Sequence, residues 1–440
     1  MKGIAQRSTQ NVEYETICVL GLGYVGLPLA IAFDGVGHEV IGFDISDDKI
    51  DTLAGGHDPT NELGDDAIDV CEVAFTTDAS MIATADYILV AVPTPIDDLK
   101  KPDLKHVVDA AEVVGAHLTA GSTVVLESTV YPGATRNVFT PTLEAVSGLD
   151  AGSDFFVGYS PERLVPGDPD RSLETVAKIV SGQTDAVCQD LAALYGTIVD
   201  AEIHRAPSME AAEAAKCIEN IQRDLNIALV NEFAIACNTL GIDTKAVLEA
   251  AATKWNFHAY RPGLVGGHCI PVDPFFMIYE SERNGFSPRL IEQAREVNEY
   301  MPKYIGEMTI KGINDCGKVL MGSTALVLGL AYKPNVADVR TSSVGGIINH
   351  LREYGVDVRA YDPHVDASDA AAEFDIEVQP ELVFADVDVA ILSTPHDDFL
   401  RIDFAEAAHE MATNPLVVDV MGALDADELE AADHLSYWRV

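Results

Sequence analysis

The segment TICVLGLGYVGLPLAIAFDGVGHEVIGFD, residues 16–44, contains two apolar runs joined by a glycine-rich turn and a helix-length stretch. Residues 16–21 form a short apolar run that ends in glycine, which is typical of a buried parallel strand. Residues 27–37 favour a helix, and residues 38–44 favour the next strand. This order of strand, turn, helix and strand predicts an α/β domain with a parallel sheet.

The turn GLGYVG has the glycine spacing of a dinucleotide-binding loop. Gly21 permits a tight turn, Gly23 lets the backbone approach a pyrophosphate, and Gly26 lets the helix pack on the strand. The phosphates would lie at the helix N-terminus, where free N–H groups point outward. The predicted cofactor contacts of this turn are Gly21, Gly23, Tyr24, Val25 and Gly26.

An acidic residue, Asp44, ends the second strand. A carboxylate at this place binds ribose hydroxyls and repels a 2′-phosphate, so the sequence predicts NAD rather than NADP as the cofactor. A glycine-rich turn that binds no ligand would not require this acid.

The C-terminal part of the chain repeats this pattern. The matched segments are ALVLGLA (325–331) with CVLGLGY (18–24), GVDVRAYD (355–362) with GHEVIGFD (37–44), and ADVDVAILSTP (385–395) with ADYILVAVPTP (85–95). The second copy has about ten extra residues after its first strand, within residues 332–343, and it lacks the second and third glycines of the fingerprint. We therefore expect a second Rossmann-like half that binds something other than a dinucleotide, with a UDP moiety as the natural candidate.

A long helix is expected between the two halves, because residues 209–240 contain neither proline nor glycine. Ser208 can cap its start and Gly241 can end it. The predicted fold class is α/β, with two parallel-sheet domains joined by a central helical domain. The expected domains are residues 1–205, which contain the dinucleotide site, residues 206–310, which form the helical part, and residues 311–440, which form the second Rossmann-like half.

The charge of the chain excludes one class of partner and favours one environment. The formal net charge is −43, from 71 acidic against 28 basic residues, which argues against binding to nucleic acid. No apolar run long enough for a membrane span occurs, and the polar first residues, expected to form a loose tail, lack a signal peptide. We interpret the charge as adaptation of a halophilic, cytoplasmic enzyme to high salt, which screens self-repulsion.

One of the seven cysteines lies in a sequence suited to catalysis. Their odd number and the absence of a CxxC pair argue against disulfides and a zinc cage, so no metal is expected. Cys269 follows a glycine-rich loop in RPGLVGGHCIPVDP (261–274), and Asp273 and Pro274 have the pattern of a helix start. A thiolate is favoured there. It can trap an aldehyde, and loss of a second hydride then gives a thioester that water hydrolyses.

Lys216 and Asn220 lie four residues apart on the predicted long helix and therefore share one face. The lysine can be merely solvated, or it can stabilise an oxyanion during oxidation. The residue pattern alone leaves both interpretations open.

The whole chain resembles the UDP-glucose/GDP-mannose dehydrogenase family. The motifs that carry the resemblance, in the family's order, are GLGYVGLP (21–28), ESTVYPG (127–133), SPERLVPG (160–167), AAEAAKCIEN (211–220), GGHCIPVDP (266–274) and GLAYKPNVADVRTS (329–342). The resemblance implies NAD-dependent four-electron oxidation of a UDP-sugar at C6, and a homodimer, or a higher homo-oligomer, built around the long helix.

The resemblance also implies roles for individual residues. Cys269 matches the nucleophile, and Lys216 with Asn220 matches the anion-stabilising pair. The supporting residues are Asp273, which positions the lysine or a water, Glu162, a base for thioester hydrolysis, and Thr129, which holds the water. The further cofactor candidates are Lys49, Thr94, Glu127 and Arg340. The substrate candidates are Glu162, Arg163, Lys216, Asn220, Arg261, Gly263, Gly267 and Lys333.

The segment ATKWNFHAYRPGLVGGHCIPVDPFF, residues 252–276, is most similar to the branch that oxidises UDP-N-acetylhexosamines for polysaccharide and other glycan biosynthesis. UDP-glucose, UDP-N-acetylmannosamine and GDP-mannose remain alternative substrates. Two other classes of protein also remain. A two-electron hydroxyacid dehydrogenase would release one NADH per substrate instead of two, and a regulator that only binds NAD or a sugar nucleotide would show no turnover.

Overall fold

The computed structural model describes residues 15–60, 62–164 and 171–440, so the tail predicted for residues 1–14 lies outside the described residues. The chain divides into two compact units. The first comprises Met1–Ile218 and Phe275–Asn284, and the second comprises Glu219–Pro274 and Gly285–Val440. Within the described part of the chain, none of the helices combines the length and apolar character needed to cross a membrane.

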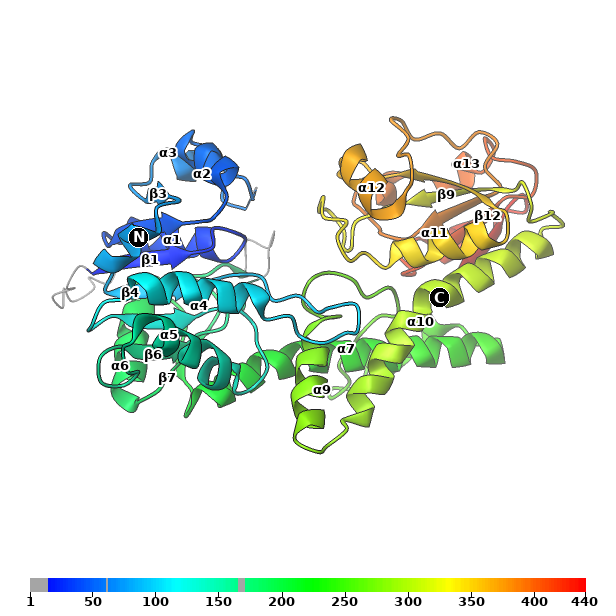
Figure 1. Ribbon diagram of the computed structural model, residues 1–440. Helices are drawn as coiled ribbons and strands as arrows, with labels where there is room; N and C mark the ends of the chain where they lie inside the picture. Colours follow the sequence, from blue (N-terminus) through cyan, green and yellow to red (C-terminus); the bar gives the residue numbers. More distant parts are fainter. Residues whose placement is uncertain (1–14, 61, 165–170) are drawn as a thin grey trace, which may run out of the picture. The chain divides into compact units, whose positions relative to one another are not determined.

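The first unit is built on a sheet with the strand order β3-β2-β1-β4-β5-β6-β7-β8 (Figure 1). The strands are β1 (Thr16–Leu20), β2 (Glu39–Phe43), β3 (Ala74–Thr76), β4 (Tyr87–Val90), β5 (Thr123–Leu126), β6 (Phe156–Tyr159), β7 (Lys178–Gly182) and β8 (Ile203–Arg205). The first six strands, β1 to β6, pair with their neighbours in parallel. Strand β7 is antiparallel to β6, and β8 is parallel to β7. The predicted parallel sheet is confirmed, and the reversed strand β7 is an addition.

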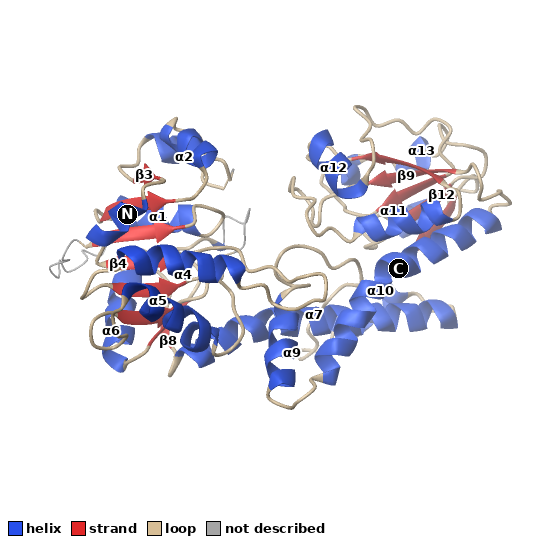
Figure 2. Ribbon diagram, viewed as in Figure 1, coloured by secondary structure: helices blue, strands red, loops and turns tan. Residues whose placement is uncertain are grey.

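Helices connect these strands and cover the sheet (Figure 2). They are α1 (Gly26–Gly35), α2 (Asp47–Ala54), α3 (Asp65–Asp69), α4 (Lys105–His117), α5 (Thr140–Ser147) and α6 (Asp185–Tyr195), with a 3-10 turn η1 (Ala79–Thr84) and a π-helix η2 (Thr135–Phe139). The core contains Leu27 and Phe33 of α1 and Leu191 of α6, all fully buried. The predicted helix after the glycine-rich turn is confirmed.

The long helix is α7 (Met209–Leu240). The Ser208 hydroxyl accepts the N–H of Ala211 at 3.2 Å, so this residue caps the helix as predicted. Gly241 follows with φ of +68°, a left-handed conformation that glycine adopts without strain and that ends many helices.

The second unit contains a parallel sheet with the order β10-β9-β11-β12-β13. Its strands are β9 (Thr324–Leu328), β10 (Asp357–Tyr361), β11 (Val389–Leu392), β12 (Leu416–Asp419) and β13 (Ser436–Arg439). The matched segments of the sequence repeat thus form matched strands, β9 with β1, β10 with β2 and β11 with β4. Residues 329–343 separate β9 from α11, whereas residues 21–25 separate β1 from α1, which confirms the insertion.

Further helices follow α7 along the chain. They are α8 (Thr244–Ala252), α9 (Asp273–Arg283), α10 (Arg289–Asp315), α11 (Val344–Glu353), α12 (Ala367–Phe374), α13 (Phe404–Ala407) and α14 (Ala426–Glu430), with a 3-10 turn η4 (Phe399–Arg401). Most of α9 is assigned to the first unit. Met301 and Ile305 of α10 pack with Ile347 and Leu351 of α11 in a core that includes the strands.

Candidate active site

The predicted cofactor-side residues follow the carboxyl ends of neighbouring strands in the first unit. They are Gly21 after β1, Asp44 after β2, Thr94 after β4, Glu127 and Thr129 after β5, and Glu162 after β6. β2 and β3 lie on one side of β1, and β4 and the strands after it lie on the other, so the strand order reverses at β1. Sheets of this kind bind ligands at the carboxyl ends of the strands beside such a switch point.

The glycine-rich turn has the geometry that a pyrophosphate requires. Gly21 has φ of +93°, and a Cβ there would lie 2.5 Å from the Ala91 carbonyl oxygen. A Cβ on Gly26 would collide with the backbone of Gly21, so helix and turn are in close contact. Around Gly23, by contrast, a Cβ would meet no atom within 4 Å, which leaves the backbone open to a ligand. This turn fits NAD.

Asp44 is buried and braces the turn. Its carboxylate accepts the N–H of Leu22 at 2.9 Å and the N–H of Ser46 at 3.1 Å, and the ammonium of Lys49 lies 2.6 Å from Oδ2. Burial raises the pKa of Asp44, but the hydrogen bonds from Lys49 and the two N–H groups outweigh it and hold the pKa below its ordinary value. The group is therefore a carboxylate at neutral pH, as ribose recognition and rejection of a 2′-phosphate require.

The second half repeats this bracing without the glycine fingerprint. Asp362, after β10, accepts the N–H of Leu330 at 2.7 Å, and Gly329 has φ of +89°. An acid at this place therefore braces the turn in both halves, whether or not the turn has the glycine fingerprint. In place of a lysine, Asp362 has the buried imidazole of His396, with Nε2 3.1 Å from Oδ2.

We expect a strong preference for NAD over NADP. The 2′-phosphate of NADP would approach the Asp44 carboxylate. Bringing two negative charges into contact costs several kcal/mol, which corresponds to a kcat/KM roughly 100-fold or more lower for NADP than for NAD. Steady-state kinetics with both cofactors check this. Comparable efficiencies would contradict the assignment. Asp44→Ala is a poor control because it also removes the bond to Leu22, so both cofactors should then bind more weakly.

Glu127 and Glu162, predicted for different roles, share a buried partner that the sequence analysis did not single out. The ammonium of Lys178 lies 2.7 Å from Glu127 Oε2 and 3.1 Å from Glu162 Oε2. The guanidinium of Arg163 donates to the Ala177 carbonyl at 2.6 Å. A lysine opening an apolar strand, as in KIVSG, was the available signal.

The loops that carry Thr94 and Thr129 are joined by the hydroxyl of Ser128. It accepts the N–H of Val92 at 3.0 Å and donates to the Val92 carbonyl at 2.7 Å. A second brace comes from Glu213 of α7, whose carboxylate accepts the N–H of Thr135 at 2.9 Å at the start of the π-helix. These bonds fix the backbone after β5 on which Thr129 stands.

In the second unit, three predicted catalytic residues come together. The carbonyl of Cys269 accepts the N–H groups of Val272 and Asp273 at 3.1 and 2.8 Å, which forms a tight turn into α9. The helix begins at Asp273 itself, one residue earlier than predicted. The Asp273 carboxylate accepts the side-chain amide of Asn220 at 2.5 Å. Lys216, one turn earlier on α7, is only 9% exposed, so it is not a solvated surface lysine.

All seven cysteines lie in the described residues, and none of them forms a disulfide. Cys18, Cys188, Cys217 and Cys237 are buried, Cys71 and Cys316 are half-buried, and Cys269 is exposed. Burial raises the pKa of the Cys18 thiol to about 12, which makes it inert. Accessibility thus agrees with the assignment of Cys269 as the chemical cysteine.

The glycine-rich loop before Cys269 is anchored at both ends. Asn231 of α7 binds both backbone groups of Gly263, with distances of 3.0 and 2.8 Å. Gly267 has φ of +90°, and a Cβ there would lie 2.9 Å from the ring of Tyr332. Arg261, at the start of the loop, is exposed.

The loop after β9 contacts the C-terminal end of the glycine-rich loop, next to Cys269. His268 Nε2 lies 2.9 Å from Asp338 Oδ2. The Arg340 guanidinium donates to both oxygens of the same carboxylate, at 2.8 Å to Oδ2 and 3.0 Å to Oδ1. The Lys333 ammonium lies over the Tyr332 ring, 5.8 Å from its centre. The structure therefore places Arg340, predicted on the cofactor side, beside the loop that precedes Cys269 in the second unit. His268 and Asp338 were not singled out from the sequence.

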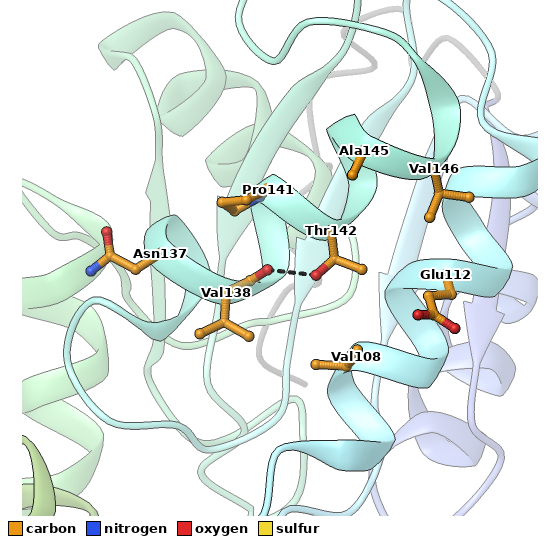
Figure 3. Close-up of a pocket in the computed structure, with 8 residues that line it drawn as sticks. All are labelled: Val108, Glu112, Asn137, Val138, Pro141, Thr142, Ala145 and Val146. Atoms are coloured by element: carbon orange, nitrogen blue, oxygen red, sulfur yellow. Dashed lines mark hydrogen bonds between the residues drawn. The ribbon is translucent and has the colours of Figure 1, made fainter.

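A hollow in the first unit lies apart from these residues. Figure 3 shows it between α4 and the segment from η2 to α5, with Thr142 donating to the Val138 carbonyl at 2.8 Å. Its lining residues are Val108, Glu112, Asn137, Val138, Pro141, Thr142, Ala145 and Val146. None of the predicted site residues is among them.

Three models of one family match the chain. They are the NAD binding domain of the UDP-glucose/GDP-mannose dehydrogenase family at residues 15–199, its central domain at residues 210–300, and its UDP binding domain at residues 326–426.

Characterised relatives match over nearly the full length. Protein CapL of Staphylococcus aureus is 44% identical over 96% of this chain and 99% of its own. The UDP-N-acetyl-D-glucosamine 6-dehydrogenase of Pseudomonas aeruginosa is 41% identical over 94% of this chain and 98% of its own. The solved structure of a UDP-D-ManNAc dehydrogenase from Pyrococcus horikoshii aligns with a TM-score of 0.88 at 28% identity, covering 97% of this chain and 99% of the other.

Proposed function

Because the chain belongs to the UDP-glucose/GDP-mannose dehydrogenase family and is an NAD-dependent oxidoreductase, we propose that it oxidises the C6 alcohol of a UDP-N-acetylhexosamine to a carboxylate. The observation that carries the four-electron chemistry is the exposed Cys269. Its turn leads into Asp273, and the Asp273 carboxylate accepts a hydrogen bond from Asn220. The 41% identity to a UDP-N-acetyl-D-glucosamine 6-dehydrogenase supports the choice of sugar.

The chemistry divides into two oxidations and one hydrolysis. Bound NAD would supply the hydride acceptor for both oxidations. In the first, the C6 hydroxyl gives its proton to a water, Lys216 and Asn220 stabilise the resulting alkoxide, and loss of a hydride from C6 leaves the aldehyde. The Cys269 thiolate then adds to the aldehyde carbon to give a thiohemiacetal, which the second oxidation converts into a thioester. Asp273 orients Asn220, to which it is hydrogen-bonded.

Hydrolysis releases the product and regenerates the thiolate. Thr129 holds the water, and Glu162 takes a proton from it as the water oxygen bonds to the thioester carbon. The carbon–sulfur bond then breaks, and its electron pair stays on Cys269. The proposal assigns Arg163, Arg261, Gly263, Gly267 and Lys333 to the nucleotide-sugar, and Lys49, Thr94, Glu127 and Arg340 to the cofactor or the closed site.

The proposal extends to domains, assembly and setting. We keep the division into residues 1–205, 206–310 and 311–440, which the ranges of the three family models support. A homodimer built around α7 is supported by exposed apolar residues that recur along that helix: Ile218, Leu229, Phe233 and Leu240. Light scattering would report the mass of the assembly. The setting is a salty cytoplasm, and the product is a precursor for glycan synthesis.

The preferred substrate should carry a 2-acetamido group. A pocket shaped for that group would leave buried polar groups unpaired when UDP-glucose binds, at about 1–3 kcal/mol. This corresponds to roughly 5- to 150-fold in kcat/KM. The expected order is UDP-N-acetylglucosamine or UDP-N-acetylgalactosamine first, UDP-glucose next and GDP-mannose last.

The test measures NADH yield and steady-state rates for these four substrates at high KCl. Two NADH per sugar support the thioester route, whereas one would indicate a two-electron dehydrogenase. Equal or better efficiency with UDP-glucose would assign the chain to that branch and leave the chemistry of Cys269 unchanged.

A further inference from the structure

The reversed strand β7 brings a lysine to the edge of the sheet where the parallel strands end. Gly158 of β6 pairs with Gly182 of β7, and Tyr159 pairs with Ser181. The same antiparallel register, continued past the ladder, places Lys178 opposite Glu162. The start of β7 thus meets the end of β6, which explains the Nζ–Oε2 distance of 3.1 Å.

Lys178, Glu127, Glu162 and Tyr195 form a buried polar cluster. Lys178 is 2% exposed, Glu127 is 1% exposed and Tyr195 is fully buried. The Tyr195 hydroxyl donates to Glu127 Oε1, while the Lys178 ammonium bonds to Oε2 of both glutamates and lies 5.1 Å from the centre of the Tyr195 ring. Buried ion pairs are weak sources of stability, since apolar residues of similar volume often serve as well. The stability of the fold therefore does not by itself account for this cluster.

The two carboxylates have different surroundings. Glu162 Oε1 accepts the N–H groups of Arg163 and Leu164 at 2.5 and 2.7 Å. Burial raises the pKa of Glu162, but Lys178 and these N–H groups outweigh it and hold the pKa below its usual value. Burial raises the pKa of Glu127 further than Lys178 can lower it, and the neighbouring Glu162 adds to the rise. The pKa values of the two glutamates are thus shifted in opposite directions.

The Glu162 carboxylate can accept one hydrogen bond more than the three that the structure shows. A carboxylate has about four lone-pair positions, and the two N–H groups and the ammonium occupy three of them. The remaining position is on Oε2, whose orientation the Lys178 ammonium fixes. A water bound there would meet an ionised, immobile acceptor.

We propose that Lys178 is a positioning residue for thioester hydrolysis, holding Glu162 as an oriented carboxylate that accepts a proton from the attacking water. This inference rests on the role given to Glu162 in the proposed function. Lys178 itself neither gains nor loses a proton in the step. The two hydride transfers do not use Glu162, so loss of Lys178 should slow hydrolysis and spare both oxidations.

The test is the first turnover of Lys178→Met with saturating NAD and UDP-sugar. We expect a burst of about two NADH per Cys269, followed by a steady rate reduced about 100-fold, the lower range for loss of a general base. Intact-protein mass should show the sugar attached at Cys269 during the slow phase. Lys178→Arg, which keeps the positive charge, should recover most of the steady rate.

Two further variants separate positioning from stability. Lys318→Met removes a lysine that is ion-paired with Asp388 in the second unit, so it should lower stability without a burst or an adduct. If Lys178→Met does not fold, Lys178→Gln removes the charge and keeps a polar side chain in the cluster. A slow steady rate with the burst retained in Lys178→Gln supports positioning. An unchanged steady rate, or a slow first turnover without a burst, would overturn the inference.

The outcomes also separate this inference from the proposed function. One NADH per sugar in the unaltered enzyme would overturn both. Two NADH per sugar in the unaltered enzyme, with a slow first turnover and no adduct in Lys178→Met, would overturn the role of Lys178 alone.

Discussion

Replacing Cys269 by alanine is expected to abolish formation of the acid, with a loss of at least about 1,000-fold, the scale seen when a nucleophile that acts with its partners is removed. The aldehyde then has no thiol to trap it, so the second hydride cannot leave. NAD binding should persist, because the glycine-rich turn and Asp44 lie in the other compact unit. Acid yield, NADH yield and cofactor titration measure these effects.

Buried cysteines provide the matched controls. Cys217 and Cys237, both on α7 and at most 3% exposed, should tolerate alanine with turnover nearly intact and a small loss of stability. If Cys269→Ala still released two NADH per sugar, the thioester route would be wrong, whatever the identity of the sugar.

The second large effect is on stability in low salt. With a net charge of −43, the folded chain repels itself, and the screening length lengthens from under 3 Å near 3 M KCl to about 10 Å near 0.1 M. We expect the melting temperature to fall by more than about 10 °C between these conditions, since each kcal/mol changes it by about 2–4 °C in a domain of this size. Circular dichroism during heating measures it.

Sucrose is the control for this prediction, because an uncharged osmolyte favours the compact state without screening charge. It should rescue the protein at low salt only in part. A melting temperature that is independent of KCl would show that the acidic surface is not an adaptation to salt.

Local sequence patterns predicted the elements that depend on nearby residues. The strand-turn-helix-strand unit at residues 16–44 and the helix from Met209 to Leu240 form as expected, because glycine spacing, apolar runs and caps act over a few residues. The segments of the internal repeat likewise fold as matched strands. Each of these signals is contained in the stretch that it describes.

Contacts between distant residues could not be predicted in this way. The reversal of β7 is set by the path of the chain after β6, so the meeting of Lys178 with Glu162 had no local signal. The His268–Asp338 pair likewise joins residues 70 positions apart. Family motifs predicted roles for Glu162 and Cys269, but they did not indicate which groups hold each residue in place.

The shared bracing by Asp44 and Asp362 separates the folding of each turn from its choice of ligand. In both halves, the acid that follows the second strand accepts a backbone N–H of the turn after the first strand. Because this bond forms with or without the second and third glycines of the fingerprint, the fold of the turn does not depend on those glycines. The same architecture can therefore serve a cofactor in one half and a different nucleotide in the other.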